Sequence, residues 1–346
     1  MSTVHFIALD VHCATTEVAV VTETGRITRR AHCPTKIPEL VEIVQSVRGP
    51  RRLTFEEGPM AGWLKRNLQR HVEQLVVCDP RRNNLIAKDS DKDDPIDAAK
   101  LAQLFRGGFV KPVHHPETLD RVVFKQHVNL YHDSVRERTR LANRIIAQFR
   151  HHGVVLAESH FAHVEDRPGL LRQLPSSTLL QQDIEWLWYV YDAAAKRVAG
   201  GGSDLQSYAR RIEEICRFTA LPGISWIRAA TFYAYIDTPW RFKNKSALWK
   251  YMGIGLDRRH SGQGHERLQV TRGGNRRLKS IIMGAAITAI ARGNNPFFDQ
   301  YQHWTMEGGL SAKNARRNVA RSEAATLWGM WKNSTEYDPT QVGRTS

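Results

Sequence analysis

The sequence predicts an α/β domain followed by a longer, mainly helical region, and three observations support this division. Short apolar runs of strand length alternate with helical patterns in the first hundred residues. Two long segments then show a 4-3 apolar alternation, which is typical of helices that pack along a seam. The remainder, from Leu205 to about Lys332, has mostly helical spacing.

The N-terminal elements are ordered as three strands and then strand and helix in alternation. Strands are expected over 4–9, 17–22, 26–32, 53–56 and 75–78. Thr24-Gly25 predicts a hairpin turn between the second and third strands. Helices are expected over 37–47 and 63–71, and Pro95 suits the first turn of another. A meander followed by alternating strand and helix is the pattern of a ribonuclease-H-like fold.

Two long helices are predicted in the middle of the chain. The first seam consists of Phe124, Val128, Tyr131, Val135, Arg138, Ala142, Ile145 and Phe149. The second consists of Leu180, Ile184, Leu187, Tyr191, Ala194 and Val198. An intrachain helical hairpin and a dimer interface fit these seams equally, because a seam does not reveal which chain it meets. Gly200-Gly201-Gly202 predicts a break after the second helix.

Composition limits the class of protein. The chain has 346 residues, which suggests two domains at roughly 150 residues each. Fifty Lys and Arg against 35 Asp and Glu give a formal net charge of +15, which favours a polyanionic partner such as nucleic acid. The longest apolar run, 281–291, is shorter than the ~20 residues of a membrane span. Four scattered cysteines indicate a reducing cytosol, so we expect a cytoplasmic protein without a membrane partner.

Four carboxylates are candidate metal ligands. Asp10 ends the first apolar run, and Glu56 ends the fourth predicted strand. Asp94 and Asp97 lie three apart on one face of a predicted helix, where paired carboxylates repel unless a cation lies between them. Mg²⁺ prefers such oxygen ligands, and two ions ~4 Å apart can stabilise both oxygens of a phosphate displacement. Any one of these acids alone would more simply be a helix cap or a surface group.

A second candidate site lies in the C-terminal region. Ser261 precedes a glycine and is surrounded in sequence by cations, although a Ser-Gly pair alone is most often a turn. A serine hydroxyl attacks phosphorus only when a base or metal removes its proton and positive charge stabilises the reaction centre. Bidentate arginine pairing suits the second task. The residues predicted to contact nucleic acid are Arg258, Arg259, Arg267, Arg272, Asn275, Arg276, Arg277 and Lys279.

Two further features of the sequence each allow more than one role. The turn Leu221-Pro222-Gly223-Ile224-Ser225 could present backbone N–H groups to a DNA phosphate, or it could simply join two helices. The C-terminal tryptophans fit a hydrophobic core, and some could stack on exposed bases. Their spacing does not select which; they include Trp240, Trp249, Trp304, Trp328 and Trp331.

Taken together, these motifs resemble the DEDD transposases of insertion-sequence family one-ten, also called bridge recombinases, to which pilin-gene invertases are related. In the first part the resemblance rests on Asp10, Glu56-Glu57-Gly58-Pro59 and Lys92-Asp93-Asp94-Pro95-Ile96-Asp97-Ala98. In the second part it rests on Leu221-Pro222-Gly223-Ile224, Met252-Gly253-Ile254, Ser261-Gly262 and Gly274-Asn275-Arg276-Arg277-Leu278-Lys279. Family members commonly carry a lysine shortly after the first Asp, where this chain has His12 and Cys13.

The resemblance implies a function for both candidate sites. Asp10, Glu56, Asp94 and Asp97 would bind Mg²⁺, with Mn²⁺ able to substitute, in a RuvC-like domain. Ser261 would form a covalent phosphoserine link to DNA in a transposase domain. Family members act as oligomers, from dimers to tetramers, in which acids of one subunit meet the serine of another. Many are guided by a structured non-coding RNA, the bridge RNA, that pairs with double-stranded donor and target DNA.

We therefore expect four segments: a RuvC-like domain over 1–112, a helical linker over 113–204, a transposase domain over 205–332 and a flexible tail over 333–346. The expected protein is a DNA transposase of the bacterial cytoplasm, associated with the nucleoid. Two alternatives stay open. One is a RuvC-like Holliday-junction nuclease that uses water in place of Ser261, and the other is a non-catalytic nucleic-acid-binding protein whose acids are structural.

Overall fold

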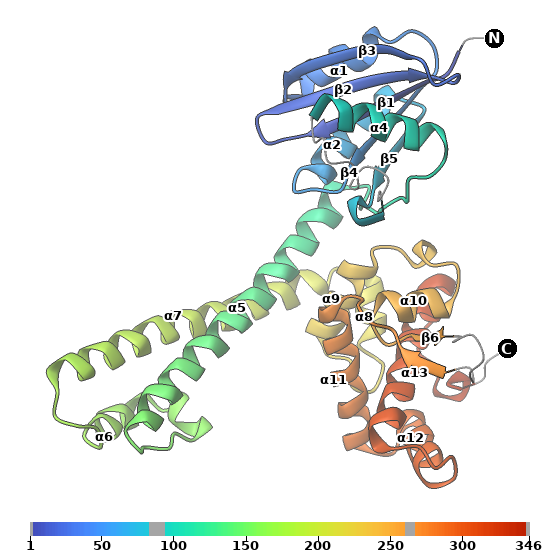
Figure 1. Ribbon diagram of the computed structural model, residues 1–346. Helices are drawn as coiled ribbons and strands as arrows, with labels where there is room; N and C mark the ends of the chain where they lie inside the picture. The colour runs from blue at the N-terminus through green and yellow to red at the C-terminus, as the bar shows by residue number, and fades with distance from the viewer. Residues whose placement is uncertain (1–2, 83–93, 260–266, 344–346) are drawn as a thin grey trace. The chain divides into compact units, whose positions relative to one another are not determined.

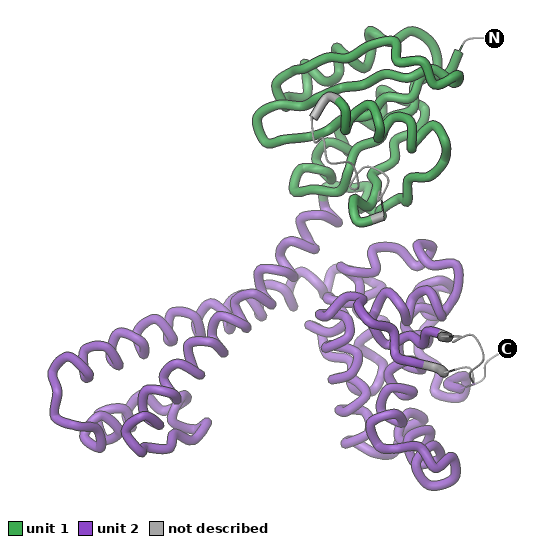
Figure 2. The backbone as a smooth tube through the Cα atoms, in the orientation of Figure 1, with its two compact units in different colours: residues 1–119 green, residues 120–346 purple. Residues whose placement is uncertain are grey.

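The computed structural model describes residues 3–82, 94–259 and 267–343, with the backbone alone at positions 82, 94, 95, 258, 259, 267 and 268. The chain divides into two compact units, Met1–Leu119 and Asp120–Ser346 (Figure 2). Each unit has its own hydrophobic core. The first boundary therefore falls a few residues after the predicted position 112, at the start of a long helix.

Unit 1 is built on a five-stranded sheet in the order β3-β2-β1-β4-β5 (Figure 1). Its strands are β1 (His5–Val11), β2 (Thr15–Thr22), β3 (Ile27–Pro34), β4 (Arg51–Glu56) and β5 (Gln74–Cys78). The first three form an antiparallel meander, and β4 and β5 continue the sheet parallel to β1. Gly25 lies in the β2–β3 turn with a φ of +88°, as the Thr24-Gly25 pair predicts. The predicted mixed sheet is confirmed.

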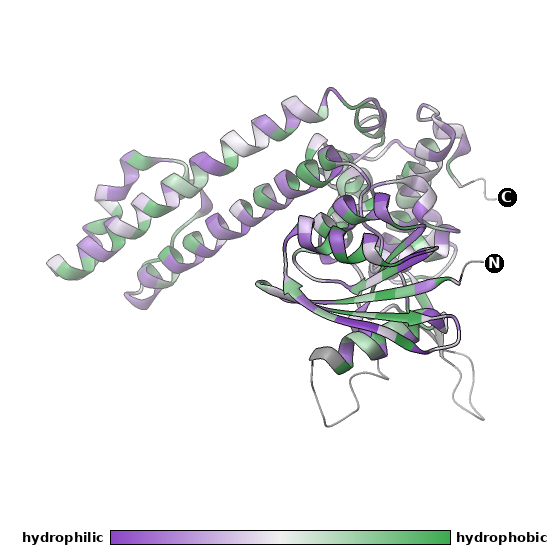
Figure 3. Ribbon diagram, turned by 90° about the horizontal axis from the view of Figure 1, so that it is seen from above, coloured by the Kyte–Doolittle hydropathy of each residue, from purple (hydrophilic) through white to green (hydrophobic). Residues whose placement is uncertain are grey.

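Helices cover both faces of this sheet, and apolar residues run along its strands (Figure 3). α1 (Ile37–Ser46) and α2 (Ala61–Leu68), which continues into η1 (Gln69–His71), share one core with alternate strand residues such as Leu9 and Phe55. α4 (Asp94–Arg106) covers the other face, where its alanines pack on Ala8 and Ala19. Short side chains on both sides let this helix approach the sheet closely. A short 3-10 turn, η2 (Pro80–Arg82), follows β5.

Unit 2 begins with an antiparallel helical hairpin (Figure 1). α5 (Leu119–His151) and α7 (Thr178–Ala209) are joined through the short elements η3 (Glu158–Phe161), η4 (Val164–Asp166) and α6 (Arg167–Leu171). At the tip, Ile145 and Phe149 of α5 pack against Ile184 and Trp188 of α7. The two predicted seams therefore meet each other within one chain, which is the hairpin interpretation.

The predicted break at Gly200-Gly201-Gly202 is wrong, because all three glycines lie inside α7. The missing side chains of Gly201 and Gly202 make room for a ring of the neighbouring helix, whereas Gly200 faces open space. A Cβ atom at Gly202 would lie 3.3 Å from Cε2 of Tyr131, and one at Gly201 would lie 3.8 Å from its Cδ2. Packing against α5 thus offsets the helix-weakening effect of glycine, which is about 1 kcal/mol per residue relative to alanine.

The rest of unit 2 is a helical bundle with one small hairpin. Its elements are α8 (Glu213–Phe218), α9 (Trp226–Ile236), η5 (Pro239–Arg241), α10 (Lys245–Tyr251), β6 (Leu256–Arg259), β7 (Arg267–Val270), α11 (Arg276–Arg292), α12 (Pro296–Met306), α13 (Ala312–Asn333) and η6 (Pro339–Gln341). One large core joins these helices to the base of the α5–α7 hairpin. The antiparallel β6–β7 pair was not predicted in this region, which was expected to be mostly helical.

The C-terminal segment packs on the same bundle. Tyr337 and Val342, from the stretch predicted as a flexible tail, contact the core. Asp338 caps η6 by accepting a hydrogen bond from the Thr340 backbone at 2.9 Å. None of the helices that the structure describes is long and apolar enough to cross a membrane.

Candidate active site

Asp10 and Glu56 lie side by side at the carboxyl end of the parallel strands. β1 and β4 pair in parallel up to Leu9 and Phe55, so the next residue on each strand is one of the two acids. Leu9 and Phe55 both point into the core formed with α1 and α2. Because side chains alternate along a strand, Asp10 and Glu56 point to the opposite face, which α4 covers.

α4 runs so that its first turn lies at this same end of the sheet. Phe105, near the end of the helix, packs edge-on against Phe6 at the start of β1, with ring centroids 5.7 Å apart. Gln103 donates a hydrogen bond of 2.6 Å to the carbonyl of Gly25 in the β2–β3 turn. Since β1 and β2 are antiparallel, that turn and the start of β1 share one end of the sheet. The N-terminus of α4 is therefore at the opposite end, beside the two acids.

The first turn of α4 carries the other two candidate ligands. Asp97 is half-buried and lies four residues before Leu101, which packs on the sheet, so both are on the sheet-facing side of the helix. For Asp94, the first residue of α4, the structure describes the backbone alone. The fold thus brings Asp10, Glu56, Asp97 and the backbone of Asp94 to one end of the sheet, although they are far apart in sequence.

The donor chemistry of this end suits a hard divalent cation, because it consists of carboxylate oxygens. Among the described side chains, no three or more His, Cys, Asp or Glu residues are gathered closely enough to hold a metal ion. The Asp94 side chain lies outside that set. The four-acid metal site therefore stays a prediction, supported by the backbone positions of its members.

Two polar contacts at this end were not predicted from the sequence. His12 Nε2 lies 3.4 Å from Asp10 Oδ2, at the position where the lysine of the related family is missing. Glu57 Oε2 lies 2.5 Å from His115 Nε2, and Lys65 donates to the His115 carbonyl at 3.4 Å. The only sequence signal for the second contact is the adjacent acid pair Glu56-Glu57, since His115 follows much later in the chain.

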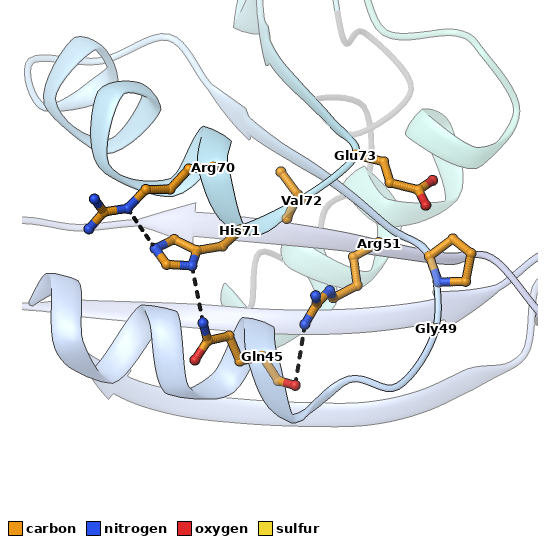
Figure 4. A pocket seen from close by; sticks show the side chains of 8 residues that line it. Gln45, Gly49, Arg51, Arg70, His71, Val72 and Glu73 are labelled. Atoms are coloured by element: carbon orange, nitrogen blue, oxygen red, sulfur yellow. Dashed lines mark hydrogen bonds between the residues drawn. The ribbon is translucent and has the colours of Figure 1, made fainter.

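A hollow of about 460 Å³ lies at the other end of the sheet (Figure 4). It is lined by residues at the start of β4 and before β5, including Arg51, Arg70, His71 and Glu73. Arg70 donates to His71 Nε2 at 3.2 Å, and Arg51 donates to the Gln45 carbonyl at 3.3 Å. In open α/β sheets, ligand sites form at the carboxyl ends of strands, so this hollow is not the candidate active site.

Ser261 falls outside the described residues and follows β6 in the sequence. The described strands on either side fix the register of the hairpin that bears it. Leu256 pairs with Val270, and position 259 lies opposite position 267. Both positions are arginines in the sequence. The side chains of Arg258, Arg259 and Arg267 are not described, so their predicted phosphate contacts remain predictions.

Two residues that were predicted to contact nucleic acid, Asn275 and Arg277, form bonds within the protein at the start of α11. The Asn275 side chain caps this helix by accepting hydrogen bonds from the backbone N–H groups of Arg277 and Leu278, both at 3.0 Å. Arg277 donates to Asn129 at 2.6 Å and to the Tyr235 hydroxyl at 2.8 Å. It also forms an ion pair with Asp133 on α5. These intramolecular bonds account for Asn275 and Arg277 without a nucleic acid.

This network changes the ionisation of its members. The pKa of Asp133 is held below its ordinary value, first by the hydrogen bond from Arg136 and also by Arg277. Burial lowers the pKa of His132 from 6.5 to about 4, and the positive charge of Arg277 adds to the effect. His132 is therefore neutral at pH 7, and its Nε2 lies 2.8 Å from the Thr231 hydroxyl. The group ties α5, α9 and α11 together.

The remaining predicted contacts of this region differ in exposure. Arg272 and Arg276 are exposed, and in the described part of the chain their side chains make no hydrogen bond or ion pair. Lys279 is half-buried on α11. Arg272 and Arg276 are therefore the described arginines best placed to meet a phosphate.

The turn Leu221 to Ser225 has a packing role. Gly223 is buried with a φ of +84°, and a Cβ atom there would lie 2.3 Å from the carbonyl oxygen of Ala285 in α11. Ser225 caps α9 by accepting a hydrogen bond from the Arg228 backbone at 3.4 Å. Arg228 in turn donates to the Gly223 carbonyl at 2.5 Å. These contacts support the helix-connecting interpretation of this turn over a phosphate contact at Gly223.

Comparison with known proteins relates both units to transposases of insertion sequences. The model of the DEDD transposase of IS110 matches residues 7–153, and the model described as the transposase IS116/IS110/IS902 family matches residues 216–302. The two matches cover about two thirds of the chain. The chain belongs to the IS110 family of DEDD transposases.

Two curated relatives carry transposase names. Transposase y4qE of Sinorhizobium fredii is 22% identical over 246 residues, which are 68% of this chain and 57% of that protein. The transposase for insertion sequence element IS1111A of Coxiella burnetii is 20% identical over 257 residues, or 72% of this chain and 69% of that protein. The chain thus spans little more than half the length of the first relative and about two thirds of the second.

Proposed function

We propose that this protein is a metal-dependent DNA transposase that cleaves and rejoins DNA through a covalent link to Ser261. The observation that carries the proposal is the convergence of Asp10, Glu56 and the first turn of α4 at the carboxyl end of two adjacent parallel strands. The family supplies the reaction class, since its members are named transposases. The net charge of +15 suits a DNA substrate.

In this mechanism the four acids Asp10, Glu56, Asp94 and Asp97 hold divalent cations, Mg²⁺ or Mn²⁺. When bound, such cations supply positive charge to the scissile phosphate and favour the deprotonated form of the attacking hydroxyl. Ser261 then attacks phosphorus, its Oγ–P bond forms as the bond to one DNA oxygen breaks, and that oxygen leaves with a proton. A DNA hydroxyl later reverses the step and frees Ser261, so phosphate bond energy is conserved.

The arginines are assigned to charge stabilisation in the same step. Arg272 and Arg276 are exposed at the start of α11, on the C-terminal side of the segment that carries Ser261. Guanidinium groups pair with two phosphate oxygens at once, which positions the phosphate and neutralises charge that develops on it. Arg258, Arg259 and Arg267 share this task in the proposal.

Two substitutions test the chemistry. Ser261→Ala should abolish both DNA cleavage and the denaturation-resistant protein–DNA adduct, with Ser280→Ala, an exposed serine on α11, as the control. Asp10→Asn should lower cleavage by at least about 100-fold while DNA binding stays equal or improves. Glu42→Gln, an exposed acid on α1, is its control. Cleavage retained in Ser261→Ala would instead show a nuclease that uses water, and a protein that binds but never cleaves would be the non-catalytic alternative.

We further propose that the active assembly is a homo-oligomer, from dimer to tetramer, guided by a structured non-coding RNA. The acids belong to unit 1 and Ser261 to unit 2, so acids of one subunit can serve the serine of another. Mixing Asp10→Asn and Ser261→Ala chains should then restore part of the activity that each lacks alone. Omitting the RNA transcribed beside the element should abolish cleavage of both donor and target DNA. Full activity without it would refute the guided reaction.

A further inference from the structure

We propose that Trp240 is a stacking platform for an unpaired nucleobase, with neighbouring lysines that contact the phosphates of the same strand. Trp240 is 70% exposed, whereas Trp328 and Trp331 are buried in the bundle core. Trp249 and Trp304 are half-buried and also pack against that core. The structure therefore distinguishes one tryptophan from a set that looks uniform in the sequence.

The turn that carries Trp240 is held from both sides. Trp328 Nε1 donates a hydrogen bond of 2.7 Å to the Pro239 carbonyl. On the other side, Arg241 donates to the Tyr235 carbonyl at 3.0 Å. The backbone N–H of Trp240 itself lies 3.4 Å from the Thr238 hydroxyl that caps η5. A ring presented by such a fixed turn loses little freedom on binding, which favours its use as a preformed contact surface.

The approach to this turn is conformationally unusual. Asp237 ends α9 with a φ of +70°, a value that residues other than glycine rarely adopt. An ion pair with Arg121 at 3.1 Å holds this conformation. Arg121 also lies 3.7 Å from the centroid of the Tyr233 ring. Three elements, α5, α9 and α13, thus cooperate to place one indole ring at the surface.

Exposure alone would carry no argument, because single exposed apolar residues are common. The charges beside Trp240 supply the second observation. Lys332 Nζ lies 5.0 Å from the Trp240 ring centroid and 4.4 Å from that of Trp328. In the sequence after Trp240 the chain carries Arg241, Lys243 and Lys245, while the next cation, Lys250, forms an ion pair with Asp257 at 2.9 Å. Lys243 is exposed, so it is free to reach a strand that stacks on the ring.

Another exposed aromatic surface, formed by a pair of rings on α7, lacks positive charge among its neighbours in the sequence. Trp186 and Tyr189 on α7 are 62% and 68% exposed and stack on each other at 5.7 Å. Their sequence neighbours Asp183 and Glu185 are acidic and exposed. A polyanion would be repelled there, whereas an aromatic ring flanked by lysines is the combination that binds single strands without sequence preference.

The chemistry recognised at Trp240 is an unpaired base together with its phosphate, which single-stranded DNA and RNA share. The inference goes beyond the proposed function and rests on it only in taking nucleic acid as the partner. Binding can be measured in EDTA, where no metal-dependent cleavage occurs. Failure of this inference is then distinguishable from failure of the proposed chemistry.

The test measures binding of fluorescent dT and U oligonucleotides and of a DNA duplex to the full chain by anisotropy. Trp240→Ala should weaken single-strand binding by about 5- to 150-fold, the range for loss of one stacked base, and change duplex binding by less than about 2-fold. Trp240→Phe should recover most of the loss, because a phenyl ring also stacks. The oligonucleotide bound more tightly identifies DNA or RNA as the source.

Two controls separate stacking from charge and from misfolding. Trp186→Ala removes a tryptophan of similar exposure, 62% against 70%, and should leave binding unchanged. Lys243→Ala should reduce the slope of log K against log salt by about 0.7, whereas Trp240→Ala should leave that slope unchanged. The proposal is overturned if Trp240→Ala binds single strands as the wild type does, if the phenylalanine variant is as weak as the alanine variant, or if duplex binding falls equally.

Discussion

Glu323 is a buried carboxyl that we expect to destabilise the folded protein as the pH rises. It lies on α13 with no exposed surface, and neither of its oxygens has a hydrogen-bond partner among the described residues. Burial raises the pKa of Glu323 well above its ordinary value of 4.5, and the positive charge of Arg228 on α9 offsets only part of that effect. The Tyr337 hydroxyl also lies near it, and the pKa of Tyr337 is raised first by burial and then by the negative charge of Glu323.

The direction of this pH dependence follows from the number of protons bound by the folded and the unfolded chain. Between the unfolded pKa, near 4.5, and the raised folded pKa, the folded chain holds a proton that the unfolded chain has lost. The free energy of unfolding therefore falls as the pH rises, by at most about 1.4 kcal/mol per pH unit. Glu323→Gln keeps the size and polarity of the side chain but removes this dependence. The variant should match the wild type below about pH 4.5 and become steadily more stable than it above that pH.

Urea unfolding at several pH values between 5 and 8 measures this difference. Eight of the nine tryptophans lie in unit 2, so tryptophan fluorescence reports chiefly on the unit that contains Glu323. Glu336→Gln, which changes an exposed acid, is the matched control and should show no growing difference. If the wild type instead gained stability relative to Glu323→Gln as the pH rose, Glu323 would be ionised and held by Arg228, and the reasoning would be refuted.

Three further predictions concern the same unit. Gly223→Ala should lower the free energy of unfolding by more than about 2 kcal/mol, because its Cβ would overlap the α11 backbone. Its control is Gly273→Ala, whose Cβ meets no atom within 4 Å and which should cost about 1–2 kcal/mol from its positive φ alone. Arg277→Met should lower the free energy of unfolding by about 1–3 kcal/mol, because it breaks a partly buried ion pair. Arg276→Met should change the free energy of unfolding by less than about 0.5 kcal/mol, and it should reduce the slope of log K against log salt for duplex binding by about 0.9. Because the pKa of His132 is lowered to about 4, stability should fall as the pH drops from about 6.5 to about 4, and urea midpoints of His132→Gln should lack that component.

The positions of Asp10 and Glu56 at strand ends could be predicted from the sequence, whereas their role as metal ligands stays a prediction. An apolar run of four or five residues that ends in Asp or Glu places that acid at a strand end, whichever strands become neighbours. The sequence could not show that β1 and β4 are adjacent, since that depends on pairing between distant segments. Nor could it show that α4 runs against β1, which follows from the contact of Phe105 with Phe6.

Features of unit 2 were harder to predict because packing overrides local preference there. Gly200 to Gly202 favour a break by propensity, yet the Tyr131 ring packs beside Gly201 and Gly202 and the helix continues. The β6–β7 hairpin interrupts a region of helical spacing, and its sign in the sequence is the short polar-apolar alternation from Arg267 to Val270. The exposure of Trp240 depends on a turn fixed by Trp328, a contact between residues far apart in the chain.

Some of the motif residues that relate this chain to its family have a packing role, and others are available for chemistry. A Cβ atom at Gly274 would lie 2.5 Å from the backbone nitrogen of Gly253, so these two glycines let a turn and the start of α11 touch backbone to backbone. Asn275 and Arg277 then fasten the same helix to itself and to α5. A phosphate-binding role for either would require breaking bonds that already satisfy them. We therefore expect the chemistry of unit 2 to involve the predicted contacts without such bonds, which among the described residues are Arg272, Arg276 and Lys279, together with the segment that carries Ser261 between β6 and β7.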